Sequence, residues 1–203
     1  MTVTRQAPRI APLAPPYAPD IDAALAKWMP PDSTIEPLLL FRTLMVHETL
    51  ASRMRPLGAG ILGATATVPP RLREVVIHRT CALVGARYEW GVHATAYGRP
   101  LGFSEQQLYS TVHGAFSDDC WDAQQAMAFR LADELHRAGT IGDELWRTLT
   151  ASLREPQILE LIVTAGWYHL IGYVCNAAGV QPERWAPDFP APQTAPHGRA
   201  PVT

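Results

Sequence analysis

Residues 69–104 read PPRLREVVIHRTCALVGARYEWGVHATAYGRPLGFS. Two prolines open this stretch and Gly85 interrupts it, so the sequence predicts one long helix before the glycine and a second from about residue 88 to residue 97. The apolar positions of the first helix are dense enough for deep burial. A turn at Gly85 and Ala86 would fold the two helices against each other, so we expect a helical hairpin.

The rest of the chain also shows helical periodicity. Asp20 and Thr34 are suited to cap helices, and Ser104 with Gln107 forms a capping-box pattern. We expect further helices at about residues 21–29, 35–47, 48–57, 122–136, 143–153 and 155–178, with a short one after Ser104. Because no stretch alternates apolar and polar residues as a strand would, the fold class predicted is all-α.

Proline-rich segments flank this helical region. They divide the chain into an N-terminal arm at residues 1–19, a single all-α domain at 20–179 and a C-terminal tail at 180–203. Both segments could be disordered or could lie over a neighbouring subunit. A weak similarity between PRLREVVI (70–77) and EPQILELI (155–162) leaves open a fold built from two related halves.

The composition limits the classes of function. The chain has 203 residues, 47% of them hydrophobic, and a net charge of −2, so nothing in it attracts nucleic acid or an anionic membrane. We find no transmembrane run and no apolar signal-peptide core, and expect a cytoplasmic protein. The three cysteines lie far apart and form no CxxC pair, which excludes a local redox dithiol.

Glu89 and His93 are the polar residues that least fit a buried helix. They are four positions apart, so they share one helix face among aromatic and apolar neighbours. The hairpin could bring Glu74 to the same place. An enclosed carboxylate beside an imidazole can exchange protons near neutral pH, which makes these three residues candidate catalytic groups.

The same spacing is compatible with a structural role or a metal site. A buried hydrogen bond between glutamate and histidine could simply join two helices. A metal could take Glu74, Glu89 and His93 as ligands, but no HExxH pattern or second histidine pair supports this, and we expect no metal. His169, in the aromatic segment 166–173, is assigned most simply to the core or a subunit interface, although it could reach the pocket.

These segments resemble the carboxymuconolactone decarboxylase family, which includes the alkylhydroperoxidase D proteins. The matching features are the RExVI string at 73–77, the YEWxxH string at 88–93 and the GFSEQQ turn at 102–107. The resemblance implies an alkylhydroperoxidase D-like helical bundle around a hairpin. It also implies assembly into a homo-oligomer, whether dimer, trimer or hexamer, that acts on a small molecule.

The peroxidase branch of that family carries CxxCxxxH with a glutamate upstream. Aligned on His93 and Glu74, its two cysteines fall on Ala86 and Glu89 of this chain. Peroxide reduction needs a thiolate and a resolving thiol, so thiol peroxidase activity is not expected.

The decarboxylase branch shares YEWxxH, and it implies cofactor-free loss of carbon dioxide from a small carboxylated lactone. In that reaction His93 would donate or relay a proton, Glu89 would tune it and Glu74 would complete the relay. The substrate-binding residues expected around them are Arg79, Tyr88, Trp90 and His169. An isomerase or cyclase step, or a catalytically silent ligand-binding scaffold, remains as an alternative.

Overall fold

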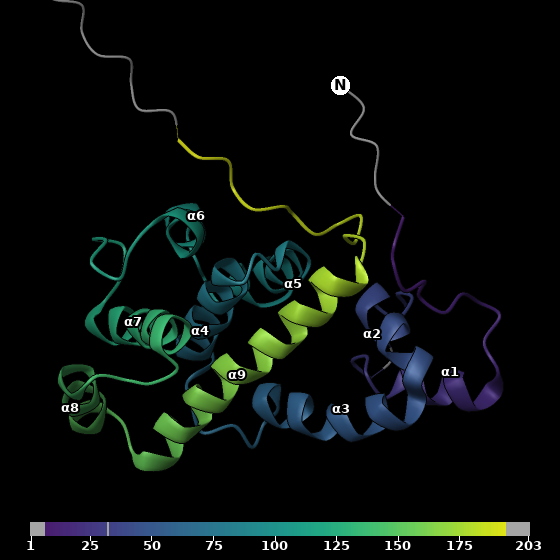
Figure 1. The fold of residues 1–203 in the computed structure, drawn as a ribbon, viewed down its shortest axis with the longest axis horizontal. Helices are drawn as coiled ribbons and strands as arrows, with labels where there is room; N and C mark the ends of the chain where they lie inside the picture. The colour runs from purple at the N-terminus through teal and green to yellow at the C-terminus, as the bar shows by residue number, and fades with distance from the viewer. Residues whose placement is uncertain (1–6, 32, 194–203) are drawn as a thin grey trace, which may run out of the picture.

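The computed structural model describes residues 7–31 and 33–193, and in them every regular element is a helix. Figure 1 shows a bundle in which the long helix α9 (Glu155–Ala178) crosses the molecule between α1–α3 on one side and α4–α8 on the other. This arrangement confirms the predicted all-α fold class.

The predicted hairpin consists of α4 (Pro70–Leu83) and α5 (Arg87–His93). Pro70 occupies the first turn of α4, where its missing N–H costs no hydrogen bond. Gly85 adopts φ 68° between the helices, a left-handed conformation that favours glycine. Nearly all of α4 after its first two residues is buried, because α7 (Ala123–Ala138) and α9 pack on it.

The N-terminal helices differ from the prediction in their bounds. They are α1 (Pro19–Ala26), α2 (Leu39–Leu44) with a short 3₁₀ turn (Met45–His47), and α3 (Glu48–Leu62). We predicted an end to α3 at Gly58, yet the helix continues past it. Gly58 is a contact position: a Cβ there would lie 3.0 Å from Cζ2 of Trp167 on α9. Its small size allows the two helices to approach closely.

Local capping signals mark the starts of α6 (Glu105–His113) and α7. The predicted capping box of α6 is present, since Ser104 and Gln107 each accept the other's backbone N–H at 3.1 Å. Asp122 caps α7 in the same manner, accepting from the backbone N–H of Gln125 at 2.8 Å. Helix α8 (Asp143–Ser152) follows and leads into α9.

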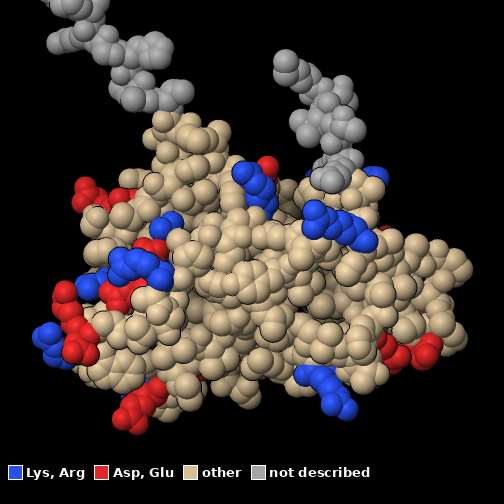
Figure 2. All heavy atoms as spheres, in the orientation of Figure 1, with Lys and Arg blue, Asp and Glu red and all other residues tan. Residues whose placement is uncertain are grey.

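Helix α9 is the most apolar element of the chain. By length and composition alone it is able to cross a membrane, but half of its most apolar window is buried inside the protein, as in the core helix of a soluble protein. Figure 2, drawn in the orientation of Figure 1, shows few charged side chains over the middle of the molecule, where α9 runs. An exposed apolar stripe follows α9: Leu159, Val163, Leu170 and Tyr173. The homo-oligomer stays a prediction, and this stripe is a natural place to look for its contacts.

Both proline-rich segments lie on the chain's own surface where they are described. Near residue 9 the N-terminal arm donates two backbone hydrogen bonds to the Ala178 carbonyl, at 2.8 and 3.1 Å. The C-terminal segment 180–193 runs back over α5 and α6. Glu183 in it accepts hydrogen bonds from the Leu39 N–H and the Tyr88 hydroxyl, both at 2.7 Å. The predicted arms also include residues 1–6 and 194–203, which lie outside the described residues.

Candidate acid–base site

His93 is the centre of a buried polar cluster formed where α4 and α5 meet. Its Nδ1 lies 2.9 Å from Oε2 of Glu74, a carboxylate that is 0% exposed. The hairpin turn at Gly85 makes this contact possible, because it returns α5 along α4. A carboxylate acceptor fixes the orientation of the imidazole ring and keeps a proton on Nδ1.

The other ring nitrogen of His93 points toward α9 and the interior of the bundle. Its Nε2 lies 3.0 Å from the hydroxyl oxygen of Tyr168 and 3.5 Å from Oε1 of Glu89. Directly after His93 the helix widens into a π-helical turn (Ala94–Gly98), and the ring of Tyr97 stacks on the imidazole at a centroid distance of 4.9 Å. Such turns are frequently found at functional sites.

Charge around His93 favours its protonated form. Burial by itself lowers the pKa of His93, but the carboxylates of Glu74 and Glu89 outweigh it and raise the pKa to about 9. His78 on α4 behaves in the opposite way, because burial lowers its pKa to about 4. The site therefore holds one imidazolium and one neutral imidazole at neutral pH.

Glu89 is the least satisfied member of the cluster. Its Oε2 is buried and has no hydrogen-bond partner among the described residues, and its Oε1 has only the 3.5 Å approach to His93. A buried carboxylate oxygen without a partner is costly for a folded protein. An unsatisfied group of this kind is a reason to look for a ligand beside it.

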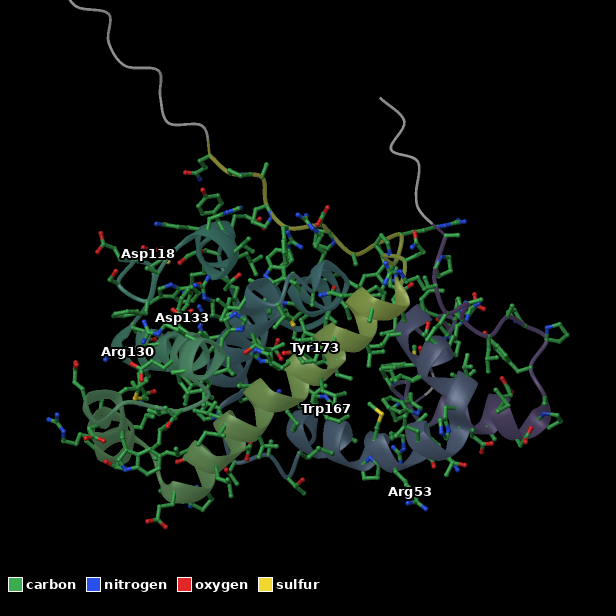
Figure 3. All side chains as sticks on the ribbon, viewed as in Figure 1. Arg53, Asp118, Arg130, Asp133, Trp167 and Tyr173 are labelled. Atoms are coloured by element: carbon green, nitrogen blue, oxygen red, sulfur yellow. The ribbon has the colours of Figure 1, made fainter. Side chains whose placement is uncertain are left out.

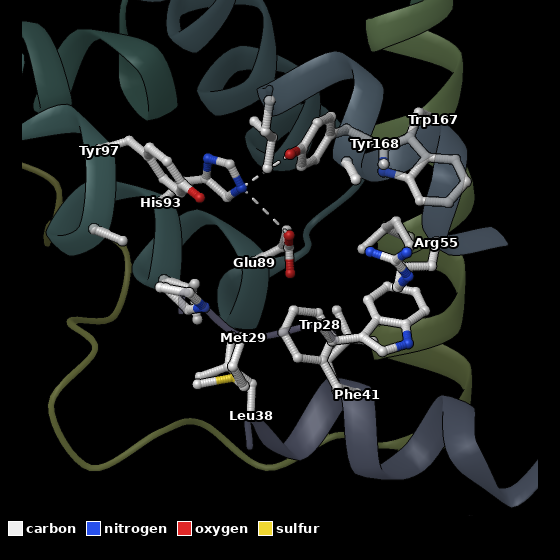
Figure 4. A pocket seen from close by; sticks show the side chains of 18 of the residues that line it. Trp28, Met29, Leu38, Phe41, Arg55, Glu89, His93, Tyr97, Trp167 and Tyr168 are labelled. Atoms are coloured by element: carbon white, nitrogen blue, oxygen red, sulfur yellow. Dashed lines mark hydrogen bonds and ion pairs between the residues drawn. The ribbon is translucent and has the colours of Figure 1, made fainter. Parts of the chain in front are cut away.

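A cavity of about 230 Å³ adjoins Glu89 and His93. Figure 4 shows the carboxylate of Glu89 directed into it, with His93, Tyr97 and Tyr168 at one end. Its remaining walls come from the connection between α1 and α2, from α2, α3 and α9, and from the C-terminal segment, and most of them are apolar. Large apolar wall residues include Trp28, Met29, Leu38, Phe41, Leu62, Trp167 and Trp185.

The structure brings together the three predicted catalytic residues but not the four predicted substrate-binding residues. Arg79 lies away from the cavity, where it pairs with Asp133 at 2.6 Å. Tyr88 bonds to the tail at Glu183, and Trp90 donates its indole N–H to Thr111 at 3.0 Å. His169 contacts His136 at 2.9 Å on the other side of α9. None of these four side chains lines the cavity.

Helical periodicity explains why Tyr88 and Trp90, the two neighbours of Glu89, do not line the cavity. Adjacent residues on an α-helix point about 100° apart, so Tyr88 and Trp90 face opposite flanks of α5. Arg79 follows Glu74 by five positions, which is about 140° around α4. The same reasoning favours Tyr97, which continues the face of Glu89 and His93 and which we did not predict as a site residue.

The described residues place neither a metal-ligand group nor a cysteine at the cavity. Residues 7–31 and 33–193 contain no group of three or more histidine, cysteine, aspartate or glutamate side chains placed to hold a metal ion. None of the three cysteines lines the cavity, and burial raises the pKa values of Cys81 and Cys175 well above the usual range. These thiols are consequently poor nucleophiles.

No family model matches the chain, and no curated protein matches it significantly. Solved structures do match. A peroxidase-related protein from Silicibacter sp. TM1040 is 14% identical with a TM-score of 0.75, over 91% of this chain and 96% of that one. The debrominase Bmp8 is 15% identical with a TM-score of 0.67, over 87% of this chain and 92% of that one.

A third structure, from Agrobacterium tumefaciens, is of a protein whose name refers to the alkylhydroperoxidase D protein AhpD. It is 14% identical with a TM-score of 0.60, over 69% of this chain and 94% of that one. Proteins with this architecture thus include an enzyme, the debrominase, which is also known in complex with 2,3,4-tribromopyrrole. At these identities the likeness concerns the fold, and it confirms the predicted one: the chain has the alkylhydroperoxidase D-like fold.

Proposed function

We propose that the chain is a cofactor-independent enzyme that transfers a proton to carbon in a small molecule, in a reaction of the decarboxylase type. The observation that carries this proposal is the position of Glu89. It lines an apolar cavity, has an unpartnered oxygen, and lies beside an imidazolium that a second carboxylate holds in place.

The three residues have different roles in this proposal. Glu74 does not line the cavity, so it acts as a positioning residue that holds His93 by its Nδ1–H. His93 supplies the proton, since it is charged at neutral pH. Glu89 lies between that proton and the substrate, either passing it on or fixing the direction of transfer. Apolar walls exclude water, which strengthens each electrostatic contact.

The reaction balances without a further reagent. The bond between the substrate carbon and its carboxylate breaks, carbon dioxide leaves, and the electron pair moves into a conjugated carbonyl as an enolate. The enolate carbon then takes a proton from the His93 and Glu89 pair, and solvent restores that proton afterwards. Decarboxylation of this type needs an electron sink in the substrate itself, so the substrate must be an unsaturated or carbonyl-bearing acid.

An isomerase or cyclase is the second candidate, and the positive charge on His93 favours it. With His93 protonated, Glu89 is paired with a cation and can act as a base toward a C–H bond next to a carbonyl. The same residues would then return the proton to a different carbon. A silent ligand-binding scaffold is the third possibility, and it requires no proton transfer at all.

Incubation of the purified chain in D₂O with a panel of carboxylated lactones and β-keto acids, including γ-carboxymuconolactone, separates these functions. Carbon dioxide release with one deuterium in the product supports the decarboxylase. Deuterium uptake without carbon dioxide supports the isomerase. Neither product from the folded protein across the panel would contradict both.

Substitution of the acid–base residue adds a control to this assay. Glu89→Gln should lower turnover at least about 100-fold, the usual contribution of general acid–base help. The matched variant Glu105→Gln changes an exposed glutamate that pairs with Arg99 on the surface, and it should leave turnover unchanged.

A further inference from the structure

Two cationic side chains that the proposed reaction steps do not use line the cavity. Arg55 comes from α3, and Lys27 directly follows α1. Figure 4 shows the guanidinium of Arg55 between Trp28 and Trp167, across the cavity from the carboxylate of Glu89. The cavity therefore has an acid–base end and a cationic end.

The polar contacts of Arg55 leave most of its guanidinium available. Its Nη1 donates one hydrogen bond, at 3.1 Å, to the backbone carbonyl of Lys27. Throughout residues 7–31 and 33–193, no carboxylate forms an ion pair with either Arg55 or Lys27. A guanidinium carries several N–H donors in a planar fork that matches a carboxylate, so free donors at a cavity wall are suited to an anionic ligand.

The volume and walls of the cavity define the rest of the ligand. An apolar cavity of about 150 Å³ holds one benzene molecule. The 230 Å³ available here therefore suits one ring with a short substituent. Three indoles and Phe41 contribute to the walls, so a planar and largely apolar ring would bury its surface well.

The charges of the cavity favour a single negative charge on that ring. Arg55 and Lys27 are cationic, and protonated His93 is balanced by Glu74 behind it. Among the described residues that line the cavity, Glu89 is the one carboxylate. With Glu89 counted against one of the two cations, one added anion would bring the cavity as a whole to neutrality, whereas a second would leave a net negative charge among apolar walls.

We propose that the substrate is a single-ring, largely apolar monoanion, such as an unsaturated carboxylic acid whose ring carries a conjugated carbonyl group, and that Arg55 binds its anionic group. This inference rests on the proton-transfer function proposed above, and it names the substrate class of the same site. Held at Arg55, the ring spans the cavity. When the bond to the carboxylate at Arg55 breaks, carbon dioxide leaves, the electron pair moves through the conjugated system, and the carbon at its far end takes the proton from the His93 and Glu89 pair. Arg55 is then a specificity-determining residue rather than an acid or a base.

The competing role for Arg55 is purely structural, tying α3 to the end of α1 through its hydrogen bond to Lys27. Binding of a charged and a neutral ligand of the same shape separates the two roles. We would use isothermal titration calorimetry with trans-cinnamate and its neutral amide, trans-cinnamamide, at pH 7. A structural role for Arg55 affects both ligands equally, whereas anion recognition affects only the carboxylate.

For wild type, cinnamate should bind at least about tenfold more tightly than cinnamamide, as expected for hydrogen bonds to a charged group. Arg55→Met should remove that preference while changing cinnamamide affinity little. Arg53→Met is the matched control, because Arg53 lies two positions earlier on α3 and points outward (Figure 3), and it should retain the preference. No binding of either ligand by wild type, or a full preference in Arg55→Met, would overturn the proposal.

The outcome is independent of turnover. Glu89→Gln enters the same titrations and should retain the preference for cinnamate, since it removes a negative charge from the cavity. If the chain shows this preference but catalyses no proton transfer, the anion site stands and the proposed reaction fails. If turnover occurs but Arg55→Met does not affect the preference, the reaction stands and the substrate class is wrong.

Discussion

Replacement of Glu74 by glutamine tests the origin of the charge on His93. The raised pKa of His93, about 9 against an ordinary 6.5, corresponds to about 3 kcal/mol of preference for the imidazolium at about 1.4 kcal/mol per pKa unit. Glutamine keeps the shape and an acceptor for the Nδ1–H but removes the negative charge. Burial then opposes protonation, with only Glu89 left to favour it.

We expect the pKa of His93 in Glu74→Gln to fall from about 9 to about 6.5 or lower. Selective ¹⁵N labelling of the histidines and a long-range proton–nitrogen NMR titration would measure it, with His93→Gln to assign the signal. Glu134→Gln is the control, because Glu134 is also buried but pairs with Arg130 on α7. An unchanged pKa in Glu74→Gln would refute the view that this carboxylate holds the proton on His93.

Two further predictions concern stability and the cavity. Because the pKa of His93 is raised to about 9 in the folded protein, protonated His93 stabilises the fold fully below about pH 6.5, and this contribution is lost as pH rises toward 9. Because the pKa of His78 is lowered to about 4, the folded protein loses stability as pH falls from 6.5 toward 4. Urea unfolding should therefore show maximal stability near pH 6.5, with slopes of up to about 1.4 kcal/mol per pH unit on either side, and a monotonic profile would contradict this. Gly58→Ala should push Trp167 into the cavity and weaken cinnamate binding about tenfold, since its Cβ would lie 3.0 Å from the indole. The control is Gly60→Ala, whose added Cβ would meet nothing within 4 Å. Its affinity for cinnamate, measured by calorimetry, should be unchanged, and its free energy of unfolding should rise by about 0.5–1 kcal/mol. Equal losses of affinity in the two variants would argue against the steric reason.

The sequence predicted the acid–base cluster because its contacts depend on local rules. Glu89 and His93 share a face through the period of the helix, and Glu74 reaches them through a hairpin whose turn is marked by Gly85. The capping box at the start of α6 was predicted for the same reason, since the Ser104 and Gln107 pair needs only neighbours in sequence.

The walls of the cavity could not be predicted in this way. Trp28, Arg55 and Trp185 are brought together by packing between segments far apart in the chain, and no periodicity within one helix reports such contacts. The extension of α3 beyond Gly58 has the same origin. The glycine by itself predicts a helix end, whereas packing against Trp167 favours a continued helix with a small residue at that position.

The C-terminal segment has a consequence for how the site is made in the cell. Trp185 lines the cavity and Glu183 binds the start of α2, so residues beyond α9 complete a pocket that begins with Trp28 near the other end of the chain. During translation, Glu74, Glu89 and His93 emerge from the ribosome long before the pocket can close. A protease that cuts after α9, or an affinity tag that displaces this segment, would leave Glu74, Glu89 and His93 in place and open the cavity beside them.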